Sequence, residues 1–455
     1  MPRYRVTITG KDYDGMADLV RKYHITVARH TVRTLAKGGF QVYAHAAGAQ
    51  LRALAAAGYK IKRFEDVDKT GKQRQAEVRT AAKKPAPPRA AAAVPDRYRT
   101  VAEVESALAA AAAPPNDAFT QLISLPEKTW EERACQAIKI ANGNAPGRIG
   151  IYFLGGVHAR EWGSPDILMN FIEQLTQAYQ THNGITIGPK KFTAAQIQSI
   201  VNGKDVYVFP QANPDGRNYS MTKDPMWRKN RRPAPATNSK CIGVDINRNY
   251  DFLWNYPQYF AAAAPIANSL DPCNETYIGP STFSEPETRN AAWMFDTFPN
   301  IGYFIDVHSF SEDILYSWGD DEDQSADVSM NFQNAAYDGT RGVVTDKTYK
   351  EYIPAADKAT AVKLATRMRD AIKAVRGRAY KVEQSVGLYP TAGTSDDYGF
   401  SRYIRDKSKG KVYSYTIEWG SPNNPTPFHP PYKEMQKIIQ EVTAGLLDFC
   451  VRAGS

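Results

Sequence analysis

Beyond residue 95, short apolar runs alternate with longer amphipathic stretches. The apolar runs, rich in β-branched and aromatic residues, are "RIGIYFLGG", "DVYVFPQANPDG", "IGYFIDVHSF" and "VYSYTIEWG". Apolar residues three or four positions apart mark helical stretches at 164–179, 360–375 and 431–449. Runs that are apolar on both faces are typical of strands buried between helices. The pattern predicts an α/β fold with a mixed central β-sheet and helices on both faces.

The first 70 residues have a different pattern. Strand-like alternation occurs in "RYRVTITG", "GGFQVYAHA" and "YKIKRF", and helical periodicity in "DYDGMADLVRKY" and "AQLRALAAAG". These elements predict a small α+β domain at 1–70, in front of the larger domain.

A basic stretch rich in Pro and Ala separates the two parts. The sequence "KTGKQRQAEVRTAAKKPAPPRAAAAVP" has few apolar side chains to bury, so it reads as a linker. Its Lys and Arg residues are sites for a trypsin-like protease. We therefore expect a linker at 71–95 and a large domain at 96–455.

Composition adds few constraints. The 455 residues carry a formal net charge of +9, with 57 basic and 48 acidic side chains, which is a modest excess for this length. We expect no nucleic-acid partner, no membrane partner, since no strongly apolar stretch reaches about 18 residues, and a monomer. No secretory signal is visible in "MPRYRVTITGKDYDGM". Four cysteines fit no metal-binding pattern and leave three disulfide pairings open, and they are Cys135, Cys241, Cys273 and Cys450.

Candidate metal ligands follow two of the apolar runs. His158 and Glu161 stand three residues apart in "GGVHAREW", a spacing that by itself also fits the solvated start of a helix. His308 closes another buried run, in "IDVHSF". Because His, Glu and His form a recurring ligand set of catalytic zinc, these three residues predict a zinc site. Asp245, in "GVDINRNYD", is a candidate to fix the His158 tautomer, although a turn aspartate is an equally good interpretation.

Charged residues at other strand ends suit a hydrolytic site for an acidic group. Glu418 lies in the apolar run "YTIEWG", where a carboxylate must be paired, neutral or functional, and beside a metal it is a candidate general base. Arg160, Arg228 and Arg248 flank the same strand ends. A guanidinium grips a carboxylate by two parallel hydrogen bonds, so the set indicates an acidic substrate group.

Seven segments resemble zinc carboxypeptidases of the pancreatic A/B type and their bacterial relatives. In the order of that family they are "GGVHAREW", "NPDGRNYS" leading to "MWRKNRR", "CIGVDINRNYD", "CNETYIGPSTFSEPET", "IDVHSFSEDILYSWG", "LYPTAGTSDDY" and "YTIEWG". The resemblance covers about 95–455 and implies a zinc carboxypeptidase fold. It also implies a zinc metallopeptidase that hydrolyses the C-terminal peptide bond of peptides or proteins.

The resemblance assigns roles residue by residue. One catalytic zinc ion would be held by His158, Glu161 and His308, with Glu418 as catalytic base and Arg228 stabilising the oxyanion. The residues implied to bind substrate, chiefly through its terminal carboxylate, are Asn247, Arg248, Tyr389 and, as a secondary contact, Arg160. Zinc would polarise the scissile carbonyl and activate a water whose proton Glu418 passes to the leaving amine.

Side-chain preference is implied by the loop "LYPTAGTSDDY". Seven residues after Tyr389 comes Asp396, where the A-type enzymes have an apolar residue and the B-type an aspartate. A buried aspartate favours a cationic partner, so a C-terminal Lys or Arg is expected. Thr394 replaces a smaller glycine and leaves mixed specificity open. Phe310 replaces a family tyrosine near the outer subsites.

The resemblance extends to maturation. Cys241 and Cys273 occupy the positions of the pancreatic disulfide, so a secreted or extracytoplasmic protein is expected. The N-terminal layout resembles a pro-segment that covers the active site until the linker is cut, although a permanent accessory domain is also open.

Two other functions stay open from the sequence. One is a zinc amidase acting on cell-wall or side-chain-linked peptides, and the other is a non-catalytic pseudo-enzyme that binds C-termini. Glu418 argues against the second, since a binding module needs no base. The set Asn247, Arg248 and Tyr389 argues against the first.

Overall fold

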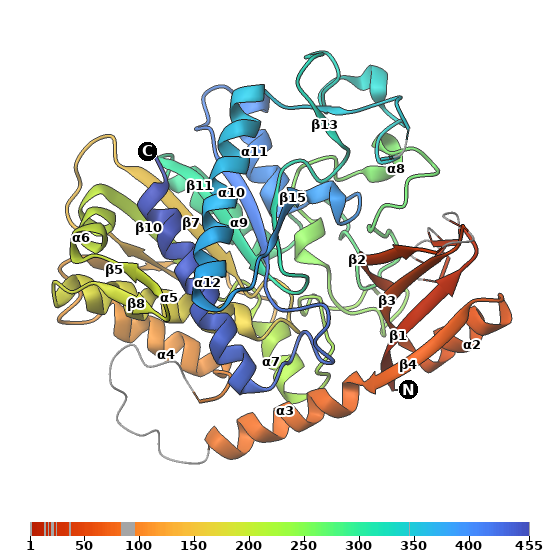
Figure 1. Cartoon of the computed structure of the whole chain (residues 1–455), viewed down its shortest axis with the longest axis horizontal. Coiled ribbons are helices and arrows are strands. Elements are labelled where there is room, and N and C mark those ends of the chain that lie inside the picture. Colours follow the sequence, from red (N-terminus) through yellow and green to blue (C-terminus); the bar gives the residue numbers. More distant parts are fainter. Residues whose placement is uncertain are drawn as a thin grey trace.

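A central sheet of eight strands organises the larger domain of this computed structural model (Figure 1). The structure describes residues 2–12, 15–16, 18–19, 22–23, 25–35, 38–82, 96–344 and 346–454. The strands of the sheet are β5 (Thr120–Ser124), β6 (Gln136–Ile140), β7 (Ile149–Gly155), β10 (Lys204–Phe209), β11 (Ile301–His308), β12 (Asp313–Tyr316), β15 (Lys381–Gln384) and β16 (Tyr413–Glu418). Their order across the sheet is β15-β12-β16-β11-β7-β10-β6-β5.

The four middle strands of this sheet are parallel. β16 pairs with β11, β11 with β7, and β7 with β10, all in parallel register. Antiparallel pairs join β12 to β16 and β6 to β10. The predicted mixed sheet is therefore confirmed, and the carboxyl ends of the parallel strands meet at one edge, where sites of α/β sheets form.

Helices cover both faces of the sheet, as the sequence predicts. The helices are α4 (Val101–Ala111), α5 (Gly163–Gln180), α6 (Ala194–Gly203), α7 (Pro214–Thr222), α8 (Tyr256–Tyr259), α9 (Pro286–Thr297), α10 (Ala355–Arg376), α11 (Ser395–Arg405) and α12 (Tyr432–Arg452). Side chains of α4, α5, α6, α10 and α12 share one apolar core, and side chains of α9 and α11 pack in the other. Short paired strands complete the domain: β8 (Ile185–Ile187), β9 (Lys190–Phe192), β13 (Asp323–Gln324) and β14 (Glu351–Tyr352).

Alternation along the middle strands explains why they are apolar on both faces. In β7, Ile151 and Phe153 join the core under α5 and α12, while Tyr152 and Leu154 join the core under α9. Successive side chains of a strand point to opposite faces, so a strand with a helix layer on each side needs apolar residues at every position.

The N-terminal part forms a separate four-stranded sheet. Its strands are β1 (Arg3–Gly10), β2 (Thr26–Thr34), β3 (Phe40–Ala47) and β4 (Lys60–Asp66), in the order β2-β3-β1-β4, with helix α2 (Gly48–Ala56). The predicted strands and second helix are present, but the sequence analysis missed β2. The helix predicted at 12–23 lies partly outside the described residues.

Part of the predicted linker is helical instead. Helix α3 (Val67–Ala82) extends from β4 along the larger domain, and residues 83–95 lie outside the described residues (Figure 1). The prediction of a linker from residue 71 is wrong for 71–82, because the helix has a narrow buried face that pattern counting overlooked. Val78 packs into the main core, and Gln75 Nε2 donates to the Ser220 carbonyl at 2.7 Å.

No helix among the described residues is long and apolar enough to span a bilayer.

Candidate active site

Three strand ends carry the residues predicted to do chemistry. His158 lies in the loop after β7, and Glu161 lies two residues before α5 begins. β11 ends at His308, β16 ends at Glu418, and these two residues are direct partners in the parallel register. The sheet therefore brings together residues that lie up to 260 positions apart in the sequence. The sequence alone could suggest this proximity but could not show it.

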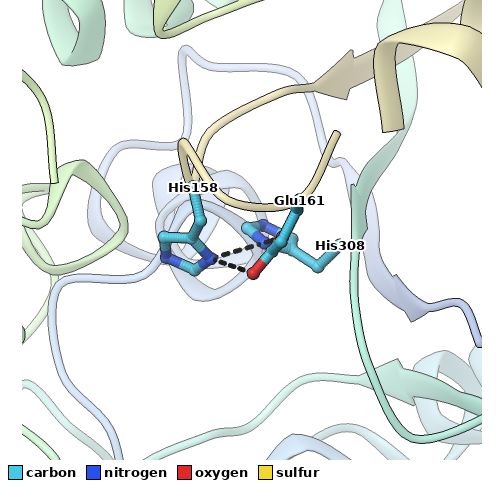
Figure 2. A group of neighbouring side chains, drawn as sticks. All are labelled: His158, Glu161 and His308. Carbon is cyan, nitrogen blue, oxygen red and sulfur yellow. Dashed lines mark hydrogen bonds and ion pairs between the residues drawn. The ribbon is translucent and has the colours of Figure 1, made fainter. Parts of the chain in front are cut away.

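The two histidines and Glu161 aim their ligand atoms at one another (Figure 2). Glu161 Oε1 lies 2.8 Å from His158 Nδ1, and Glu161 Oε2 lies 3.1 Å from His308 Nδ1. The two Nδ1 atoms are 3.0 Å apart. All three residues are buried, at 6%, 2% and 1% exposure for His158, Glu161 and His308. Among the described residues this is the one such group of three or more potential metal ligands.

The second nitrogen of each histidine faces a further carboxylate. His158 Nε2 lies 3.2 Å from Asp245 Oδ1, as the sequence suggested, and His308 Nε2 lies 2.9 Å from Asp306 Oδ2. Metal-binding histidines usually place their other ring nitrogen on a carboxylate or carbonyl, which fixes the tautomer. Asp306 was not predicted from the sequence. Its signal was its position two residues before His308, on the same face of the strand.

The donor set fits zinc. Two imidazole nitrogens and one carboxylate, held by the loop between β7 and α5 and by the end of β11, with each histidine facing a buried aspartate, match the three protein ligands of a catalytic zinc site. Burial raises the pKa of Glu161, but the two histidines outweigh it and hold it below its usual range. A carboxylate that stays ionised in this position is what a cation requires.

Glu418 lies beside these three candidate ligands, and its surroundings raise its pKa. Burial raises the pKa of Glu418 to about 8, against the opposing effect of His308 and with a further contribution from Glu161. Its Oε2 atom is buried and has no hydrogen-bond partner in the described parts of the chain. A carboxyl group with a free oxygen and a pKa near neutrality is suited to taking and returning a proton.

The predicted arginines surround the same space with different partners. Arg228 donates from Nε and Nη2 to Asp245 Oδ2, at 2.9 and 2.8 Å. Arg248 donates to two backbone carbonyls, those of Ala267 and Asn247, at 3.0 and 2.6 Å. No ion pair joins Arg248 to a carboxylate of the described residues. Its guanidinium charge is thus available to an acidic ligand.

The remaining substrate-binding candidates lie around Arg248. Asn247 precedes it and accepts the Ser395 N–H at 2.9 Å through Oδ1. The Tyr389 ring lies 5.9 Å from the Arg248 guanidinium carbon. Arg160 is more constrained, since its Nη1 donates to Glu275 at 3.1 Å and its guanidinium lies over the Phe428 ring.

Asp396 lies at the start of α11 and is 4% exposed. Its Oδ2 atom accepts from the Ser385 and Thr416 hydroxyls at 3.0 and 3.2 Å. The described Lys and Arg residues form no ion pair with it. This carboxylate therefore has neutral hydrogen-bond donors but no cationic partner within the described chain.

A family model described as zinc carboxypeptidase matches residues 107–445, which is most of the chain. The chain belongs to the zinc carboxypeptidase family. Membership makes it a metallocarboxypeptidase and implies zinc as its metal.

Curated relatives of this family carry both B-type and A-type names. Carboxypeptidase B of Astacus astacus is 29% identical over 293 residues, covering 64% of this chain and 76% of that protein. Carboxypeptidase B of Homo sapiens is 30% identical over 294 residues, covering 64% and 55%. Zinc carboxypeptidase A 1 of Anopheles gambiae is 34% identical over 193 residues, covering 42% and 38%. For the latter two relatives, the alignment spans only about half of their length or less.

Solved carboxypeptidase structures share the fold over nearly the whole chain. Carboxypeptidase A from Helicoverpa armigera superposes with a TM-score of 0.71 at 20% identity, covering 100% of this chain and 98% of that one. Thrombin activatable fibrinolysis inhibitor superposes with a TM-score of 0.70 at 19% identity, covering 99% and 98%. These likenesses extend to the N-terminal domain, whose residues lie within the covered part.

The N-terminal domain contributes to the walls of the active-site cavity. A cavity of about 80 Å³ is lined by His158, Glu161, Arg248 and Glu418 together with Val27 and His45 of the small domain. A larger cavity of about 500 Å³ shares Arg228 and Tyr389 with it and is also lined by Ile25 and Val27. The carboxypeptidase site is thus closed on one side by another domain of the same chain.

The disulfide implied by the family resemblance is present. Cys241 and Cys273 are bonded, whereas Cys135 and Cys450 are free and buried. The bond joins the segment before Asp245 to the loop that carries Glu275, and so ties together two segments that border the site.

Proposed function

We propose that the protein is a zinc-dependent carboxypeptidase that hydrolyses the C-terminal peptide bond of peptides or proteins. The observation that carries the proposal is the group His158, Glu161 and His308, which lies beside Glu418. Arg248, which has no carboxylate partner among the described residues, lines the same cavity. When bound by these three ligands, zinc supplies a Lewis acid that polarises the scissile carbonyl and acidifies water.

The chain's own residues supply the other requirements of the reaction. Glu418 takes a proton from the attacking water and returns it to the leaving amine. Arg228, held in place by Asp245, offers positive charge to the oxygen of the scissile carbonyl, where preorganised charge contributes most. Arg248, Asn247 and Tyr389 bind the free carboxylate of the substrate. Because this grip needs a chain end, the enzyme removes terminal residues.

We further propose that Asp396 selects C-terminal Lys or Arg. Support comes from its burial, from its lack of a cationic partner among the described residues and from the B-type names of two relatives. A buried carboxylate gains most from a cationic guest, which restores the interaction lost on leaving water. Asp396→Ala should reduce kcat/KM for peptides ending in Lys or Arg relative to matched peptides ending in Leu. The control variant is Asp370→Ala, because Asp370 is exposed. Asp397→Asn is unsuitable as a control, since Asp397 is hydrogen-bonded to Asp396.

We also propose that the N-terminal domain restrains the intact enzyme. Val27 and His45 line the active-site cavity, and one fold relative is described as thrombin activatable. A chain beginning near Val94 should hydrolyse a long peptide faster than the full chain does. Equal rates of hydrolysis by the two chains would instead support a permanent accessory domain.

One assay tests the central proposal. The protein, with and without limited trypsin treatment, is incubated with peptides that vary at the C-terminus, and the released amino acids are identified by mass spectrometry. Release of single C-terminal residues that stops on zinc removal supports a carboxypeptidase. Cleavage only of amide-linked side chains would support an amidase, and tight binding without release would support a binding protein. We expect the protein to act outside a reducing cytoplasm, because it carries the Cys241–Cys273 disulfide.

A further inference from the structure

The outer face of the N-terminal sheet lies against the larger domain. In β3, Val42, Ala44 and Ala46 are buried in the small domain's own core, so Tyr43 and His45 point to the other side. On the neighbouring strand β1, Arg5 is 6% exposed and donates from Nη2 to the Pro422 carbonyl at 2.9 Å. This face is a contact surface between the two domains, and His45 is one of its side chains.

His45, which is half-buried, packs its ring against a pair of aromatic side chains of the larger domain, Phe310 and Phe428, whose own ring centroids are 5.0 Å apart. Its ring centroid lies 5.8 Å from that of Phe310, edge to face, and 5.6 Å from that of Phe428. Its Nε2 atom is inaccessible to solvent and has no hydrogen-bond partner in the described parts of the chain. The same ring lines the cavity that contains the catalytic group. A neutral ring fits against the two aromatic rings, whereas protonation would place a charge on a ring whose buried Nε2 has no hydrogen-bond acceptor in the described parts of the chain.

Positive charges outnumber negative ones around the His45 ring. Charged and titratable groups that face His45 from both domains include Arg3, Arg5, Arg160, Glu275 and His429, and Asp271 lines a cavity of about 200 Å³ together with His45 and Glu275. Three of these six carry a fixed positive charge, whereas the carboxylates Glu275 and Asp271 favour a protonated ring. Burial, followed by the effect of Arg160, lowers the pKa of His45 to about 3 from its ordinary value of 6.5.

We propose that His45 makes the contact between the N-terminal domain and the active site sensitive to pH: the neutral ring holds the domain in place, and protonation on mild acidification separates it from the aromatic pair Phe310 and Phe428. The inference rests on the proposed restraint of the intact enzyme, and it adds a trigger that needs no cut in the chain. Acid opening would expose the active site reversibly, unlike proteolysis.

The sign and size follow from proton linkage. When a histidine has a lower pKa in the closed state than in the open state, protonation favours opening. Closure is therefore strongest above the free pKa of the histidine and weakens as the pH falls below that value. With a pKa of about 3 when closed and 6.5 when open, the closing equilibrium weakens roughly tenfold per pH unit below 6.5. Between about pH 7.5 and about pH 5, the loss amounts to roughly 30-fold.

Hydrogen exchange of the full-length zinc-loaded chain tests this inference without using catalysis. Protection of peptides covering 40–47 and 67–75 is measured at both pH values, corrected for intrinsic exchange, against a core peptide covering 301–308. Wild type should lose roughly 30-fold protection in the first two peptides and regain it on return to neutral pH. His45→Phe keeps the ring without a titrating nitrogen and should lose the pH dependence of peptide 40–47, as should His45→Gln, which covers the case that one variant folds poorly.

Two results would overturn the inference. One is a protection loss in wild type no larger than that of the core peptide. The other is an unchanged loss in both His45 variants, which would point to His429 or to carboxylates instead. A full-length chain that is already fully active at neutral pH would remove the proposed restraint of activity but would leave the exchange result intact. Zinc content measured at both pH values separates opening from metal loss.

Discussion

Two pairs of histidines, one in the metal site and one at the contact with the N-terminal domain, have opposite surroundings. His158 and His308 each face a carboxylate through Nε2, at 3.2 Å from Asp245 and 2.9 Å from Asp306. His45 and His429 face aromatic rings and arginines, and neither forms an ion pair with a carboxylate of the described residues.

The difference decides what each ring can do. Although burial alone would lower it, Asp306 and Glu161 raise the pKa of His308 well above its usual range. Burial, followed by the charge of Arg160, lowers the pKa of both His45 and His429 to about 3. Carboxylates around a ring make a site that attracts positive charge, such as a metal ion. Arginines and aromatic rings make a site that excludes it. The same residue type therefore serves metal binding in one place and neutral packing in another.

The largest effect is expected from removing a ligand of the carboxylate-lined site. His308→Ala should abolish bound zinc and with it peptide hydrolysis, because two protein ligands hold the ion far less tightly than three. Metal analysis of the purified protein measures the loss, and the exposed His182→Ala serves as the matched control. Full zinc retention with normal activity would remove His308 from the ligand set.

A charge-neutral change at Glu418 should separate metal binding from chemistry. Glu418→Gln keeps the shape but cannot take a proton, so kcat should fall by about 100-fold or more while zinc content stays at the wild-type level. Steady-state kinetics and metal analysis on the same preparation measure both. Near-normal turnover would exclude Glu418 as the base.

A smaller effect is expected from the aspartate behind His308. Asp306→Asn should weaken zinc binding by about 10- to 100-fold, because it removes the charge that orients and strengthens the ligand. Competition with a chelator measures the affinity, and the exposed Asp370→Asn is the control. If affinity is unchanged, the 2.9 Å contact is only structural.

The fold and the candidate site residues could be predicted from the sequence. Contacts that depend on how helices, strands and domains pack against one another could not. The strands of the larger domain were readable because burial on both faces demands apolar residues at every position. His158, Glu161, His308 and Glu418 were readable because polar groups at the ends of such strands stand out; their roles stay predictions until the variants above are measured. Asp306 did not stand out, since its role depends on which way the His308 ring turns.

The N-terminal region was harder to predict for the same physical reason. β2 alternates weakly, and α3 has a buried face made of a few residues that pack only against the larger domain. The periodicity of a segment does not reveal a narrow face that another domain buries. The sequence pattern therefore indicates a linker where α3 forms. His45 looks like an ordinary outward-facing strand residue until the position of Phe310 is known.

The smallest effect concerns how closely α3 approaches the larger domain. Gly71 is buried, and a Cβ added there would lie 2.4 Å from Pro225 Cβ, closer than carbon atoms approach without displacement. Gly71→Ala favours the helix itself by about 1 kcal/mol. Overpacking costs about 1–3 kcal/mol, so the net result should be a contact weakened by roughly 1 kcal/mol, or about fivefold. Hydrogen exchange of 67–75 at neutral pH measures this, with Lys72→Ala on the exposed face of α3 as the control. A Gly71→Ala protein more protected than wild type would show that helix propensity outweighs the clash. The close approach to Pro225 would then contribute little to holding the domain.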